Sequence, residues 1–116
     1  MKKLLISFLL LLPCVYVFAD TTKQLSKRCE RLSKRIDKII WDQRSYGCRK
    51  YLAIAAKESH QGAGYLLEKN YQDAYGIMVH VRALLDYSRE ISCQHWIEIN
   101  EGREEARSII RALENI

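Results

Sequence analysis

Two cysteines placed symmetrically about a turn constrain this 116-residue chain more than any other feature. Asn70 lies 22 residues after Cys48 and 23 residues before Cys93. A helix rises about 1.5 Å per residue, so two antiparallel helices joined at Lys69-Asn70 would bring the cysteines to the same height. A disulfide requires Cα atoms within about 7 Å, which this arrangement allows. The spacing predicts a helical hairpin clamped at its open end by a Cys48–Cys93 disulfide.

Charged and polar residues agree with that register. Glu58 and Arg82 are placed to meet across the hairpin, and the same register sets His60 opposite His80. Two facing imidazoles are half of a metal site, and neither a Cys-x-x-Cys nor a His-Glu-x-x-His spacing is present to complete it. A metal-handling protein that uses His60 and His80 therefore stays open as an alternative.

The remaining sequence indicates helices throughout, since strong helix formers dominate and no strand-like alternation of useful length appears. A first helix is expected over about 22–45, starting at a Thr21/Gln24 capping box and ending before Gly47. The second begins near Cys48. The third is expected from about Tyr71 to Ile99, and a short last helix over about 103–115 follows a break at Asn100 and Gly102. We predict an all-α fold: a small helical bundle of three long helices and a short C-terminal one.

The apolar stripe of the first helix carries a third cysteine. Its members repeat at steps of 4, 3, 4 and 3, as one face of a helix requires, and they are Leu25, Cys29, Leu32, Ile36 and Ile39. A buried free thiol is the expected state of Cys29. An intermolecular disulfide is the alternative, and it would make a homodimer through Cys29 or the first helix.

The N-terminal segment is typical of a secretory signal. Lys2 and Lys3 precede an apolar run, and Val17-Phe18-Ala19 ends in a small residue at the expected cleavage position. We predict a signal peptide over 1–19 and a single helical domain over 20–116, exported to the periplasm or secreted. The protein would then contact the membrane only during export. An uncleaved anchor and lipidation at Cys14 are the alternatives.

Charge is unevenly distributed along the chain. Residues 20–50 contain ten Lys or Arg against four Asp or Glu. The first helix carries a basic face formed by Lys27, Arg31, Lys34 and Lys38. This face indicates an alternative function, binding of an anionic envelope polymer or lipid. A simpler explanation is that the basic first helix faces water or an acidic last helix.

Catalytic and nucleotide-binding motifs are absent from the sequence. There is no Gly-x-Ser-x-Gly, no phosphate loop and no haem-attachment motif. We expect a protein that is not an enzyme, carries no cofactor and binds no nucleic acid. Trp41, Trp96 and the seven tyrosines are expected to pack the helix ends.

The cysteine pattern resembles that of small periplasmic helical proteins. Cys48-x-x-Tyr51-Leu52, with Cys93 45 residues beyond the first cysteine, is similar to the layout of acid-stress chaperones and of some secretion-toxin immunity proteins. The resemblance implies a function by binding to another protein, in an immunity, inhibitor or chaperone-like role.

A partner-binding surface is expected at the turn end of the hairpin, opposite the disulfide. His60, Gln61, Tyr71 and Tyr75 are the candidate contact residues. The segment His60–Gly64 contains two glycines that lower helix stability, and tyrosine is frequent in interfaces. Close helix packing through Gly62 and Gly64 is the alternative explanation for those glycines.

Overall fold

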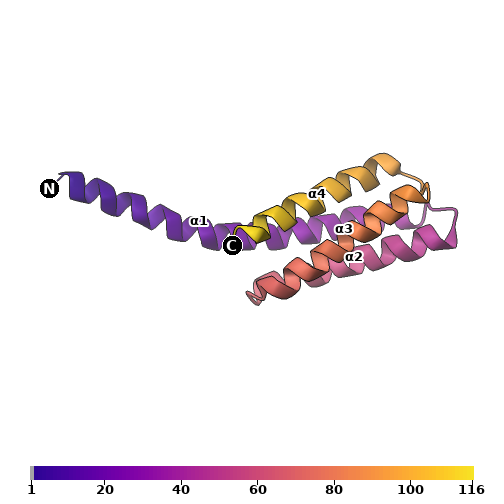
Figure 1. Cartoon of the computed structure of the whole chain (residues 1–116), viewed down its shortest axis with the longest axis horizontal. Coiled ribbons are helices and arrows are strands. Elements are labelled where there is room, and N and C mark those ends of the chain that lie inside the picture. Colours follow the sequence, from indigo (N-terminus) through magenta and orange to yellow (C-terminus); the bar gives the residue numbers. More distant parts are fainter. Residues whose placement is uncertain (1) are drawn as a thin grey trace.

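The computed structural model describes the backbone of residues 2–116 and the side chains of residues 21–116. Four helices and no strand occur in this range: α1 (Lys2–Ile40), α2 (Tyr46–Leu67), α3 (Tyr71–Glu90) and α4 (Trp96–Glu114). Short connections make consecutive helices antiparallel, and α1 also packs against α4 (Figure 1). The predicted all-α bundle is confirmed.

The first half of α1 projects beyond the bundle, and the C-terminus lies near the point where α1 leaves it (Figure 1). α1 runs through Thr21 without interruption, so the expected capping box does not start a helix there. The predicted signal peptide over 1–19 lies outside the residues whose side chains are described. No helix in the described part of the chain has the length and apolar character needed to cross a membrane.

The apolar stripe predicted for the first helix is the face that α1 buries. Its five members, Leu25, Cys29, Leu32, Ile36 and Ile39, all belong to the core. They meet apolar side chains from the other three helices, which include Leu52, Met78, Leu85 and Ile109. Removal of this apolar area from water is the main force that holds the four helices together.

Helix α2 is continuous through both glycines, and only one of them has a packing role. A Cβ on Gly62 would lie 3.1 Å from the sulfur of Met78 and 3.3 Å from Ile77, whereas a Cβ on Gly64 would meet nothing within 4 Å. Gly62 therefore permits the close approach of α3. The alternative explanation of close helix packing is therefore confirmed for Gly62 but not for Gly64.

The boundary between the first two helices lies earlier than predicted. α1 ends at Ile40 rather than near residue 45, and α2 begins at Tyr46. The reason is the cap at Ser45, whose hydroxyl accepts a hydrogen bond from the backbone N–H of Cys48 at 3.0 Å. Gly47 consequently lies in the first turn of α2 and does not end α1.

The prediction of a third helix that continues to Ile99 is wrong. α3 ends at Glu90 because Ser92 adopts a left-handed conformation (φ 59°) and the N–H of Cys93 donates to the carbonyl of Ser88. Gly102 does not interrupt a helix. It lies inside α4, where a Cβ would be 3.3 Å from Leu32 and 3.5 Å from Leu85.

Candidate binding surface at the disulfide end

The predicted disulfide is present. Cys48, in the first turn of α2, is bonded to Cys93 in the connection between α3 and α4, with a Cα–Cα distance of 5.6 Å. The bond therefore fixes the start of α2 to the α3–α4 connection. Disulfides form and persist in oxidising environments, so this one is typical of an exported protein.

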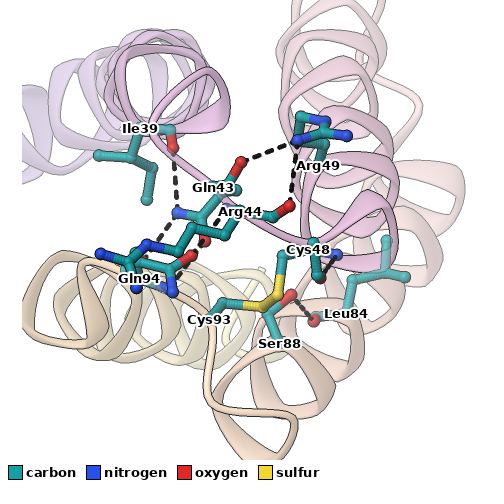
Figure 2. Close-up of a disulfide and its surroundings, with 10 residues drawn as sticks. Ile39, Gln43, Arg44, Cys48, Arg49, Leu84, Ser88, Cys93 and Gln94 are labelled. Carbon is teal, nitrogen blue, oxygen red and sulfur yellow. Dashed lines mark hydrogen bonds between the residues drawn. A yellow bond between two sulfur atoms is a disulfide. The ribbon is translucent and has the colours of Figure 1, made fainter.

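Gln43 forms a second link between the two connections at this end (Figure 2). Its side-chain amide donates to the carbonyls of Ile39 (3.0 Å) and Gln94 (2.8 Å), and its side-chain oxygen accepts from the N–H of Gln94 (2.8 Å). The Gln94 side-chain oxygen in turn accepts from the N–H of Arg44 (2.9 Å). The α1–α2 and α3–α4 connections are thus joined by hydrogen bonds as well as by the disulfide.

Arg49 stabilises the α1–α2 connection from the α2 side. Its guanidinium donates to the carbonyl of Gln43 at 2.9 Å (Figure 2). Gln43 is itself almost fully buried, at 2 % exposure. A buried amide that satisfies three backbone groups holds a loop in one conformation, because each of those groups would otherwise be left without a partner.

Large apolar side chains cover the outside of this braced end. Trp41 is 86 % exposed, Tyr46 73 % and Trp96 63 %, so the tryptophans do not pack the helix ends as expected. Ile91 and Ile97 are exposed as well. We call this set the tip cluster: Trp41, Tyr46, Ile91, Trp96 and Ile97.

Contacts beneath these side chains show that they share one end of the bundle. Asp42, next to Trp41, lies 2.9 Å from His95, next to Trp96. A Cβ on Gly47, next to Tyr46, would be 4.0 Å from Ile91. Exposed large apolar groups that gather in one place mark binding surfaces more often than scattered ones do.

The residues predicted to contact a partner lie toward the turn end of the bundle, but their contacts differ from one residue to the next. His60 is exposed and lies 2.6 Å from Glu30 of α1, and Gln61 is also exposed. Tyr71 is half-buried, with its hydroxyl 3.3 Å from Thr22 of α1. The hydroxyl of Tyr75 instead bonds Glu114 of α4. Tyr71 also lines a pocket with Leu66 and Ile116, whereas His60 and Tyr75 do not.

The histidines predicted to face each other are paired with separate carboxylates. His80 lies 2.5 Å from Glu58, the residue that had been expected to meet Arg82, and Arg82 pairs with Asp86 instead. His60 is turned toward α1. Among residues with described side chains, no group of three His, Cys, Asp or Glu is placed to hold a metal ion.

Cys29 is fully buried and free, as expected for a core thiol. Its pKa is raised to about 12, chiefly by burial; Arg28 opposes the rise, and the nearby carboxylates of Glu105 and Glu30 contribute to it. The thiol points at the sulfur of Met78, 3.8 Å away. An intermolecular disulfide through Cys29 would require α1 to move away from the core.

The basic face of α1 forms a second distinctive surface. Lys27, Arg31, Lys34 and Lys38 are all exposed, and none of them has an ion-pair partner among the described side chains. Arg28 and Arg35, by contrast, pair with Glu105 and Glu101 of α4. The acidic last helix therefore faces part of the basic first helix, as expected, but the outward cations stay unpaired.

Sequence reasoning missed the tip cluster, although a signal for it existed. Trp41, Tyr46 and Trp96 each lie within seven residues of Cys48 or Cys93, the positions already predicted to close one end of the hairpin. Aromatic residues in a connection, such as Trp41, or at the first position of a helix, such as Tyr46 and Trp96, have little core to enter. Their exposure follows from that position.

Comparison with known proteins gives no relative for this arrangement. No protein-family model matches the chain, and neither a curated protein nor a solved structure does.

Proposed function

We propose that this is an exported protein that acts by binding another protein through the tip cluster. The observation that carries the proposal is the exposure of Trp41, Tyr46 and Trp96 over a frame that a disulfide and Gln43 hold together. Tryptophan and tyrosine are enriched among the residues that dominate binding energy in interfaces.

The braced frame favours a dedicated partner over many weak ones. Binding costs conformational entropy when loops must be ordered, and a surface that is already ordered avoids much of that cost. Promiscuous binders use flexible, loop-rich or methionine-rich surfaces instead. An immunity or inhibitor role therefore fits the tip cluster better than a chaperone-like one.

Affinity capture from cell-envelope extracts tests this with two matched double variants. Tyr46→Ala/Trp96→Ala removes two aromatic rings from the tip cluster, and Tyr71→Ala/Tyr75→Ala removes two from the turn end. We expect a single stoichiometric partner that is captured by the unmodified protein and by the turn-end variant, and lost with the tip variant.

Two other results would contradict the proposal. Loss of the partner only in the turn-end variant would move the site to Tyr71 and Tyr75. Many weak partners that increase on acidification would indicate a chaperone. Repeating the measurement with the purified partner by calorimetry gives the stoichiometry directly.

The export half of the proposal has its own test. We expect the protein isolated from the cell envelope to begin at Asp20, after removal of residues 1–19. Its intact mass decides this, since a mass that includes residues 1–19, or a lipid on Cys14, would contradict cleavage after Ala19.

A further inference from the structure

The outward face of α1 is a basic surface, and Trp41 follows directly after the end of the helix. Lys27, Arg31, Lys34, Lys38 and Trp41 follow one another at steps of 4, 3, 4 and 3, and all five are exposed. At about 1.5 Å per residue, the four cations span about 16 Å along the helix. They lie on the side of α1 opposite the buried stripe, where Arg31 borders the groove toward α4 and Lys34 borders the groove toward α2. We call the four cations and Trp41 together the α1 stripe.

The acidic residues near the α1 stripe do not neutralise it. Glu30 and Asp37 line the groove between α1 and α2 together with Lys34, and Glu30 is paired with His60. On the other side of α1, Glu101 and Glu105 are held by Arg35 and Arg28. The four cations of the stripe thus face solvent without a carboxylate partner among the described residues.

We infer that the α1 stripe docks the protein onto an anionic lipid bilayer. Each Lys or Arg held near such a surface is attracted to it, and the four exposed cations follow one face of a single helix. Tryptophan prefers the boundary between water and lipid, where Trp41 would lie. Trp41 belongs to both the α1 stripe and the tip cluster, so the variants that test lipid docking and partner binding leave Trp41 unchanged.

The composition of the stripe favours lipid over an acidic protein. Three of its four cations are lysine, and lysine is depleted in protein–protein interfaces whereas arginine is enriched. Protein recognition of carboxylates uses the planar fork of arginine, which lysine lacks. Attraction to a charged bilayer needs only positive charge close to the surface.

Vesicles of defined composition test the inference on the full mature protein. We expect it to sediment with vesicles that mix phosphatidylglycerol and phosphatidylcholine, but not with vesicles of phosphatidylcholine alone. Binding should fall steeply as salt is added, because exposed charges are screened. Trp41 and Trp96 are the only tryptophans in the chain, so Trp96→Phe leaves Trp41 as the sole fluorophore. Its emission should shift to shorter wavelength on binding.

Two triple variants distinguish the effect of the α1 stripe on vesicle binding from the effect of net charge alone. Lys27→Gln/Lys34→Gln/Lys38→Gln should weaken vesicle binding about 100-fold, given the attraction of each cation to an anionic surface. Lys50→Gln/Lys57→Gln/Arg111→Gln removes the same charge from exposed positions on α2 and α4 and should weaken it far less. Thermal melts should show that both variants are folded.

Three outcomes would overturn the inference. These are equal weakening by the two triple variants, equal binding to neutral vesicles, and binding to soluble polyphosphate without binding to vesicles. None of them would affect the tip cluster, because partner capture is measured separately with Tyr46→Ala/Trp96→Ala.

Discussion

The two ends of the bundle are built in opposite ways. At the disulfide end, two connections are joined by the Cys48–Cys93 bond and by Gln43, and large apolar groups remain outside. At the other end, a single turn at Lys69-Asn70 joins α2 to α3, and the helices approach closely over Gly62. One end is held by covalent and polar bonds beneath exposed aromatics, and the other by close packing. A bundle that relied on apolar packing alone would have buried its tryptophans.

Among the substitutions that test the difference between the two ends, loss of the disulfide should lower the stability most. We expect Cys48→Ala/Cys93→Ala to lower the free energy of unfolding by about 4 kcal/mol, the value that the chain-entropy model gives for a loop of this size. Urea denaturation with and without a reductant measures it. The unmodified protein should lose stability when reduced, whereas the variant should not respond. A reductant effect below about 1 kcal/mol would show that the disulfide end is held by its hydrogen bonds instead.

Gln43→Ala should have the next largest effect, with a cost of about 2 kcal/mol. The variant leaves the N–H of Gln94 and two backbone carbonyls without their partner in a mostly buried site. Gln61→Ala is the matched control, because Gln61 is exposed on α2 near the turn end. It should change the free energy of unfolding by less than about 0.5 kcal/mol. Equal effects of the two variants in urea denaturation would remove the distinction between the ends.

The disulfide end illustrates how far sequence reasoning reaches. Helix rise alone pairs Cys48 with Cys93, because the turn is correctly placed at Lys69-Asn70 and Cys93 lies only three residues beyond the end of α3. The bracing by Gln43 is beyond such reasoning. Two of its three bonds depend on two connections, about 50 residues apart, adopting particular backbone conformations.

Boundaries and side-chain partners were predicted less well than the pairing. Gly102 has the sequence properties of a helix break, and only the approach of Leu32 and Leu85 explains why it lies inside α4. Glu58 was expected to meet Arg82 but pairs with His80, whereas Arg82 pairs with Asp86 on its own helix. Whether His60, Gln61, Tyr71 and Tyr75 contact a partner stays a prediction.

Gly62 and Gly64 of α2 test the close packing of the turn end. Gly64→Ala should raise the free energy of unfolding by about 1 kcal/mol, because alanine is the better helix former and the site is open. Gly62→Ala should not show this gain, since the new methyl group would lie 3.1 Å from the buried sulfur of Met78. Thermal unfolding of the pair measures the difference. Equal stabilisation by both would mean that α2 and α3 are not in close contact at Gly62.

The smallest change in stability is expected for Trp41, the most exposed of the large apolar side chains in the tip cluster. Trp41→Ala should change the free energy of unfolding by less than about 0.5 kcal/mol, because its side chain is 86 % exposed and little area returns to water. Leu66→Ala, a fully buried site near the turn end, should cost about 2–5 kcal/mol in the same denaturation assay. A residue that contributes nothing to folding yet keeps a large apolar ring in water is better explained by binding than by stability. A loss above about 1 kcal/mol for Trp41→Ala would show that the ring packs in solution, and the proposed binding surface would lose its largest exposed member.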